Sequence, residues 1–171
     1  MGKLEQIKQS AKTLNLGGLA MNAEHFVTKA EKENMTTSEF LDMVLIGELQ
    51  HRTQRARERR IKEAGFPYVK RLDDFDLSFQ TSITERQLRQ LAELNWIEQM
   101  YNLMFFGPPG VGKTHLSLAL AYKAAEEGYK VVYTTMTTLV QTLRTAEISR
   151  QSKTKLNRML RANLVVIDEV G

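Results

Sequence analysis

The chain has 171 residues, of which 42% are hydrophobic and 26% are charged, a balance that is ordinary for a globular protein of one domain or of a small domain with part of a second. It contains no cysteine, which excludes disulfides and thiolate metal sites, and it shows neither a signal peptide nor an apolar run of membrane-spanning length, so we expect a cytoplasmic protein without a membrane partner. The formal charge of +4 is uneven, because residues 51–71 hold eight Lys and Arg against two Glu.

The first 65 residues are predicted to be all-helical. Apolar residues at helical spacing indicate a helix over 3–14, and Gly17 and Gly18 are expected to interrupt it. Asn22 is expected to cap a second helix that ends near Lys32.

A third helix is predicted to begin at a capping box, because Thr36 and Glu39 have the T-x-x-E spacing. It is expected to run to Ala64, with Pro67 blocking its continuation. Its first half is apolar on one side, whereas its second half is almost wholly polar and basic.

Residues 66–80 are interpreted as a linker, in which Phe75 and Phe79 either pack in a core or border an adenine ring. Thr84 and Gln87 then indicate another capped helix, which is predicted to run to about Tyr101.

From residue 102 the pattern changes to alternating strands and helices. Strands are predicted over 102–106, 130–135 and 164–168, and helices over 113–127, 138–147 and 152–161. Short apolar strands that alternate with helices are typical of a parallel sheet covered by helices. The predicted fold class is therefore α/β with an all-helical N-terminal domain, divided as 1–66 (helical), 67–82 (linker) and 83–171 (α/β).

The segment GPPGVGKT (107–114) fits the phosphate-loop pattern G-x-x-x-x-G-K-[ST] and lies between a predicted strand and a predicted helix, the context that this pattern requires. Glycines let the backbone wrap around phosphates, while N–H groups and the positive end of the helix dipole face the anion. Lys113 is expected to reach the β- and γ-phosphates and Thr114 to ligate Mg²⁺. The expected nucleotide contacts are Gly107, Pro108, Pro109, Gly110, Val111, Gly112, Lys113, Thr114 and His115.

Two alternatives apply to this loop. A glycine-rich turn that binds nothing is disfavoured because both the pattern and its context match. His115 follows Thr114 directly and is interpreted as a residue of the first helical turn rather than as a catalytic base.

Asp168 and Glu169 follow four apolar residues of the last predicted strand. In P-loop NTPases such a strand delivers an aspartate that holds Mg²⁺, usually through water, and Glu169 is well placed to activate the attacking water. This pair favours ATP hydrolysis over a kinase-like transfer. The alternative is a buried strand that meets a solvated loop.

These motifs resemble the IstB-like transposition helper ATPases of insertion sequences, which are AAA+ proteins related to the DnaC helicase loaders and the DnaA initiators. The resemblance rests on NLMFFGPPGVGKTHLSLALAYKAAEEGYKVVYTTMTTLVQTLRTA (102–146) and NLVVIDEVG (163–171). The segment SEFLDMVLIGELQHRTQRARERRIKEAGFPYVKRLDDFDLSF (38–79) is similar to that family's helical domain and its linker.

The resemblance implies an ATP- and Mg²⁺-dependent homo-oligomer that binds double-stranded DNA, regulates target selection and stimulates a transposase. It implies catalytic roles for Lys113 and Glu169, and metal-binding roles for Thr114 and Asp168. The family's ATPase domain continues beyond the position of Gly171, with a sensor strand between the P-loop strand and the Asp-Glu strand, an arginine that reaches a neighbouring subunit, and a lid. We therefore expect a truncated, C-terminally incomplete AAA+ sheet, and a 171-residue chain that folds poorly and is inactive alone.

Arg52, Arg55, Arg59 and Lys62 lie at i, i+3, i+7 and i+10, which makes one stripe if the helix is continuous. Such a stripe is suited to DNA phosphates, with little sequence specificity expected. A solvated helix face, or contact with acidic residues of a neighbouring subunit, is the alternative.

Two other functions stay open besides the transposition helper. A DnaC-like loader of a replicative helicase has the same chemistry and a different partner. A truncated, non-catalytic module would bind DNA or the partner without any effect of ATP.

Overall fold

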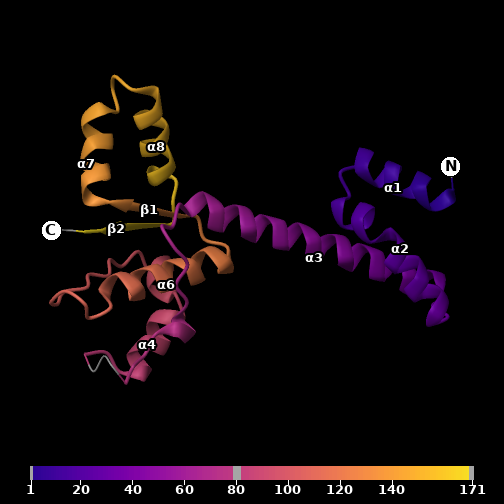
Figure 1. The fold of residues 1–171 in the computed structure, drawn as a ribbon, viewed down its shortest axis with the longest axis horizontal. Helices are drawn as coiled ribbons and strands as arrows, with labels where there is room; N and C mark the ends of the chain where they lie inside the picture. Colours follow the sequence, from indigo (N-terminus) through magenta and orange to yellow (C-terminus); the bar gives the residue numbers. More distant parts are fainter. Residues whose placement is uncertain (1, 79–81, 170–171) are drawn as a thin grey trace. The chain divides into compact units, whose positions relative to one another are not determined.

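The computed structural model describes residues 2–78 and 82–169, which divide into a first compact unit that ends at Ala56 and a second that begins at Arg57. Phe79 lies outside the described residues. The elements are α1 (Lys3–Thr13), α2 (Gly17–Lys32), α3 (Thr37–Ala64), the 3-10 helix η1 (Leu72–Asp74), α4 (Glu85–Ala92), α5 (Asn95–Glu98), α6 (Lys113–Glu127), β1 (Val131–Thr135), α7 (Met136–Thr145), α8 (Arg150–Leu160) and β2 (Leu164–Asp168) (Figure 1). Because α3 crosses the boundary at Ala56, it contributes residues to both units.

In the first unit, α2 begins at Gly17, so the predicted cap at Asn22 is wrong. The reason is a carboxylate from another helix: Glu48 on α3 is buried, and its Oε2 accepts the Leu19 N–H at 3.0 Å in the first turn of α2. Asn22 instead donates its Nδ2 to the carbonyl of Gly18 at 3.0 Å within the helix. A side chain far away in the sequence thus supplies the cap that local pattern could not reveal.

Gly18 is required where α2 meets α3. A Cβ at this position would lie 2.8 Å from Cβ of His51 and 2.9 Å from Oε2 of Glu48. The absence of a side chain therefore lets the first turn of α2 approach α3 closely enough to be capped.

The start of α3 is confirmed. The Thr36 N–H donates to Oε2 of Glu39 at 2.7 Å, and the Glu39 N–H donates to Oγ1 of Thr36 at 3.3 Å, which is the reciprocal capping box. The predicted end at Ala64 is confirmed as well.

In the second unit, β1 and β2 lie side by side and form a parallel pair, from Val131 opposite Leu164 to Thr135 opposite Asp168 (Figure 1). The strands predicted over 130–135 and 164–168 are thereby confirmed, as is the helix over 113–127. The mixed helix and strand composition and the parallel sheet agree with the predicted α/β class. The chain of α7 and α8 joins β1 to β2 as two packed helices.

The strand predicted over 102–106 is wrong for the described residues, because this segment pairs with neither β1 nor β2. Its side chains nevertheless alternate as in a strand: Leu103 and Phe105 pack inward, whereas Met104 is 73% exposed and Phe106 is 87% exposed. A strand needs a hydrogen-bonded neighbour, and apolar pattern alone does not provide one.

The helix predicted from Thr84 to about Tyr101 is interrupted and consists of α4 and the short α5. Thr84 and Gln87 form the expected capping box, but the chain leaves the helix before Leu94, whose φ is +60°. The Trp96 indole donates to the carbonyl of Leu91 at 2.9 Å, and Leu94 is buried. Tertiary burial of these residues outweighs the continuation of the helix.

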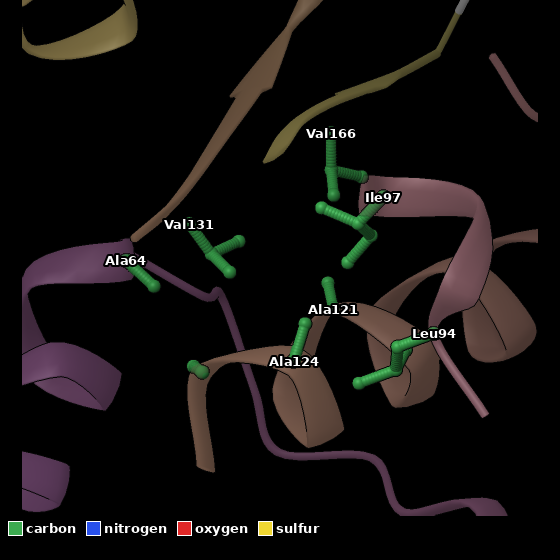
Figure 2. Close-up of a cluster of buried hydrophobic side chains, with 8 residues drawn as sticks. Ala64, Leu94, Ile97, Ala121, Ala124, Val131 and Val166 are labelled. Atoms are coloured by element: carbon green, nitrogen blue, oxygen red, sulfur yellow. The ribbon is translucent and has the colours of Figure 1, made fainter. Parts of the chain in front are cut away.

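The core of the second unit consists of two clusters on either side of α6, which is why α6 is buried over most of its surface. The sheet cluster joins β1, β2, α5, α6 and the end of α3, and its side chains converge in Figure 2; it comprises Ala64, Leu94, Ile97, Ala121, Ala124, Ala125, Val131 and Val166. The loop cluster comprises Leu88, Leu116 and Leu120, with partly buried apolar residues of the linker and of 102–106 packed against it. These clusters hold the N-terminal end of α6 next to the end of β2.

Candidate nucleotide-binding site

The loop 107–112 leads into α6 through glycines with left-handed backbone angles. Gly110 has a φ of +82° and Gly112 a φ of +85°, a conformation that is unfavourable for residues with a Cβ. Gly112 is the N-cap of α6, and no side chain among the described residues caps this helix end. The first-turn N–H groups and the positive end of the helix dipole are therefore suited to an anion.

Lys113 is the first residue of α6, and its ammonium group lies over the loop. Its Nζ donates to the carbonyl of Gly107 at 2.8 Å and to that of Pro108 at 2.7 Å. A positive charge is thus held among the backbone groups that are expected to surround the phosphates.

Thr114 and Asp168 meet although they are far apart in the sequence. Thr114 Oγ1, in the first turn of α6, donates to Oδ1 of Asp168, the last residue of β2, at 3.1 Å. The structure therefore brings together the two residues that were predicted as metal ligands.

The pair fits Mg²⁺ by donor type. Thr114 Oγ1 and Asp168 Oδ1 lie 3.1 Å apart, and both are oxygen atoms of the kind that this hard cation prefers. A hydroxyl and a single carboxylate also form the sparse oxygen donor set that Mg²⁺ uses when it keeps its waters and binds nucleotide phosphates.

Tyr133 is a residue of this site that sequence patterns did not reveal. Its hydroxyl donates to Oδ2 of Asp168 at 3.2 Å. Burial, and next the negative charge of Asp168, raise the pKa of Tyr133 to about 12, so the phenol stays protonated and remains a donor at neutral pH. The sequence offered one signal for this contact: Tyr133 stands two residues before the end of β1, the strand that pairs with β2.

Glu169 follows Asp168 directly and is exposed. Its φ of +55° is unusual for a residue other than glycine, and such local strain clusters at functional sites. The side chain predicted to activate water thus lies directly after the end of β2.

A cavity of about 440 Å³ adjoins the phosphate loop. One wall is the loop itself, including Gly107 and Lys113, and the opposite walls are formed by apolar side chains with a few amides. The remaining lining residues are Phe75, Ser82, Ile83, Gln87, Gln90, Leu91, Met104, Phe105, Phe106, Pro108, Val111, Gly112 and Leu116. A cavity with both apolar and polar walls, next to a predicted phosphate loop, is suited to a nucleobase.

Of the two arrangements that were open for Phe75, packing in a core is confirmed, whereas a contact with an adenine ring stays a prediction. Phe75 packs against the loop cluster, and it also lines the cavity. Its ring lies 3.2 Å from the position of a Cβ on Gly112 and meets His115 edge-on at 5.4 Å between ring centroids. His115 Nε2 lies 3.4 Å from the carbonyl oxygen of Arg71, so this ring contacts the linker.

The basic stripe on α3 consists of Arg52, Arg55, Arg59 and Lys62, and only two of these side chains lie near a carboxylate in the described structure. Arg52 donates Nε to Oε1 of Glu48 at 2.8 Å and Nη2 to the carbonyl of Asn15 at 3.1 Å. Arg59 lies 3.7 Å from Glu63. Arg55 and Lys62 are exposed and form no ion pair with any residue that the structure describes.

Within the two described ranges, none of the helices combines the length and apolar character needed to cross a bilayer.

The P-loop class of nucleotide-binding proteins is defined by two features: a glycine-rich loop that opens a helix, and a carboxylate that lies near this loop at the end of a parallel strand. Both are present here, since Asp168 at the end of β2 contacts Thr114 in the first turn of α6. Comparison with known families gives the particular one. The family described as "IstB-like ATP binding protein" matches residues 9–171, and the chain belongs to it.

Relatives in several bacteria agree with this family. The chain is 37% identical over 158 residues to a protein of Pseudomonas aeruginosa named as an ATP-binding protein of insertion sequence IS21, with 92% of this chain and 60% of the relative covered. It is 36% identical over 166 residues to an IS21-like ATP-binding protein of Bacteroides fragilis, with 97% and 83% covered. It is 34% identical over 167 residues to an ATP-binding protein of insertion sequence IS5376 in Geobacillus stearothermophilus, with 98% and 66% covered. The chain thus spans about 60% of the length of the Pseudomonas relative.

Proposed function

We propose that the chain binds ATP together with Mg²⁺. The single observation that carries this proposal is the contact between Thr114 Oγ1 and Asp168 Oδ1 at 3.1 Å, which joins the phosphate loop to the strand-end carboxylate. Phosphates would lie at the first turn of α6 with Lys113, and the base would enter the adjoining cavity. Thr114 and Asp168 would hold Mg²⁺, which would supply positive charge against the phosphates.

We propose further that the intact protein hydrolyses ATP, with Lys113 stabilising the phosphoryl charge and Glu169 activating water. The expected test is Glu169→Gln, which keeps the size of the side chain and removes the base. ATP binding should persist within about twofold, whereas turnover should fall by about 100-fold or more, since general base catalysis contributes roughly 10²–10⁴.

A matched control for this variant is Glu147→Gln, because Glu147 is also exposed and lies in the turn that follows α7. Unchanged turnover in Glu169→Gln would contradict the role of Glu169. A loss of ATP binding in the same variant would mean that it disturbs the site as a whole.

The biological role that we propose is that of a DNA-binding helper in insertion-sequence transposition. The family and the names of the relatives support a connection with insertion sequences over helicase loading. We propose double-stranded DNA, a cognate transposase and further copies of the chain as partners. The proposed division is a helical domain over 1–66 for DNA or partner binding, a linker over 67–82 and the ATPase domain over 83–171.

The DNA contact is proposed for the exposed part of the α3 stripe. Replacing Arg55 and Lys62 by Ala should weaken binding to DNA of any sequence and lower the slope of log K against log salt by about 2, because each phosphate contact contributes about 1. Lys3→Ala with Lys32→Ala removes the same charge from exposed positions on α1 and α2 and serves as the control. Equal salt slopes for the two double variants would exclude a specific role for the stripe.

A further inference from the structure

The parallel register places Tyr133 and Asp168 on the same face of the sheet. Tyr133 on β1 is opposite Val166 on β2, and Asp168 lies two residues further along β2. Because side chains alternate between the two faces of a strand, residues two apart share a face. The tyrosine ring packs against the sheet cluster next to Val166, and its hydroxyl reaches beyond the cluster to Asp168.

The two oxygens of Asp168 consequently have different partners from different elements. Thr114, at the start of α6, donates to Oδ1, and Tyr133, within β1, donates to Oδ2. A carboxylate that receives one hydrogen bond on each oxygen is restricted in rotation about its last torsion. The orientation of Asp168 is therefore set by the helix and by the neighbouring strand together.

These two donors are not equivalent once a metal is considered. The Thr114 hydroxyl is itself the expected Mg²⁺ ligand through its oxygen, so on the Oδ1 side of Asp168 the donor and the expected metal ligand are the same group. The hydrogen bond from Tyr133 is on the other oxygen and is compatible with metal at Oδ1. We propose that Tyr133 is a positioning residue of the nucleotide site, whose hydroxyl holds the Asp168 carboxylate in the orientation that receives Mg²⁺ with ATP.

This role rests on the proposed binding of ATP and Mg²⁺. Tyr133 would not contact the metal itself but would orient Asp168, as hydrogen-bond partners of metal ligands commonly do. It requires the hydroxyl and not only the ring, which separates it from packing. Tyr133→Phe keeps the ring in the sheet cluster and removes only the hydroxyl, and thermal unfolding verifies that the variant is folded.

The chain offers a matched control at Tyr129, which lies just before β1. Its hydroxyl also donates to a carboxylate, Oε1 of Glu98, at 3.1 Å, but at an exposed position away from Asp168. Tyr129→Phe therefore removes the same kind of hydrogen bond without touching the site.

The experiment measures binding of a fluorescent ATP analogue to the full 171-residue chain, in EDTA and at increasing Mg²⁺ concentration. In Tyr133→Phe the Mg²⁺ concentration that gives half of the tightening should rise by about tenfold, the lower end of the usual effect of such outer contacts. Binding in EDTA should change by less than about twofold. Tyr129→Phe should behave as the wild type in both conditions.

A second measurement combines Tyr133→Phe with Asp168→Asn. If Tyr133 acts through Asp168, its substitution should have no further effect on the Mg²⁺ dependence in the Asp168→Asn background. An equal effect in both backgrounds would overturn the proposal.

The remaining outcomes distinguish a failure of the role of Tyr133 from a failure of the proposed binding of ATP. Equal weakening with and without Mg²⁺ would show that Tyr133 is only structural, and an unchanged Mg²⁺ dependence would overturn its role while ATP binding stands. A wild-type chain that binds no nucleotide would overturn the proposed function and the role of Tyr133 with it.

Discussion

Two helices of this protein, α2 in the first unit and α6 in the second, begin in glycine-containing segments and lack a cap from their own N-cap side chains. At α2 the buried carboxylate of Glu48 provides the anion, held by the Leu19 N–H and by Arg52. At α6 no described side chain does so, and the first turn is left with the loop and Lys113. A helix N-terminus favours a negative charge. At α2 the protein itself supplies this charge, whereas at α6 the position is available to an anionic ligand.

The largest expected effect is at α6. Lys113→Ala removes the charge beside the loop, and ATP affinity should fall by about 100-fold, since hydrogen bonds between charged groups contribute about 1.5–3 kcal/mol each. Lys123→Ala is the control, because Lys123 lies on the same helix and its ammonium is 3.6 Å from a carboxylate oxygen of Glu127. Titration of a fluorescent ATP analogue measures both variants, and equal affinities would contradict a special role for the first turn.

At α2 the corresponding change is Glu48→Gln, which removes the charge but keeps the shape. We expect the first unit to lose about 2 kcal/mol of stability, because the contact of the buried carboxylate with Arg52 and the helix cap are both weakened. Urea unfolding followed by far-UV circular dichroism measures the helices, while fluorescence of Trp96 reports the second unit separately.

The control for Glu48→Gln is Glu24→Gln, since Glu24 pairs with Lys8 on the surface at 3.6 Å and should contribute less than about 1 kcal/mol. ATP affinity should be unchanged in both variants. A loss of stability in Glu24→Gln as large as in Glu48→Gln would mean that the cap of α2 has no particular weight.

A smaller effect is expected from the loop glycines. Gly110→Ala and Gly112→Ala both place a Cβ on a left-handed backbone, which costs about 1–2 kcal/mol and should weaken ATP binding by about tenfold. At Gly112 the new Cβ would also meet the Phe75 ring at 3.2 Å, whereas at Gly110 nothing lies within 4 Å. Both variants should lower the melting temperature through the strained backbone, and Gly112→Ala should lower it further because the Phe75 ring and the linker are displaced. Equal melting temperatures of the two variants would contradict this difference.

The smallest effect is the pH dependence of the α2 cap. Burial raises the pKa of Glu48, but hydrogen bonds from Arg52 and from the Leu19 and Gly18 N–H groups outweigh it, and the pKa lies below the ordinary value of 4.5. A carboxylate with a lowered pKa in the folded state stabilises it above the pKa of the unfolded state, and this contribution disappears as the pH falls through the folded-state pKa.

The difference in urea midpoint between the wild type and Glu48→Gln should consequently be full at pH 7 and shrink below pH 4.5. The two proteins should approach each other in acid, where the Glu48 carboxyl is protonated and the glutamine side chain of the variant is its neutral analogue. A difference that stays constant down to about pH 3 would show that the charge of Glu48 does not contribute.

Much of the second unit could be predicted from local pattern. The glycines and Lys113 of the loop, the helix that follows them and the strand that ends at Asp168 depend on residues that are close together in the sequence. The capping boxes at Thr36 and Thr84 were predicted for the same reason, since both partners lie within one turn of helix. The division of the chain at residues 66 and 82, and the roles of the site residues, stay predictions.

The predictions that were wrong concerned features that depend on residues far apart in the sequence. The segment 102–106 has the alternation of a strand but no paired neighbour among the described residues, and the helix after Thr84 ends early because Leu94 is drawn into the sheet cluster. Asn22 was predicted as a cap because the buried carboxylate of Glu48, on another helix, could not be seen in the local pattern.

By itself, the amino-acid sequence determined which chemical groups this protein presents: a loop of the phosphate-loop pattern, a lysine beside it, and a strand that leads into two adjacent carboxylates. Such features follow from short-range spacing, because turn geometry and helix caps involve neighbouring residues. Only the tertiary structure decided that Thr114 meets one oxygen of Asp168 while Tyr133 meets the other. The physical reason is that the register of β1 on β2 and the packing of α6 in the core set these distances, and both arise from contacts between residues far apart in the chain.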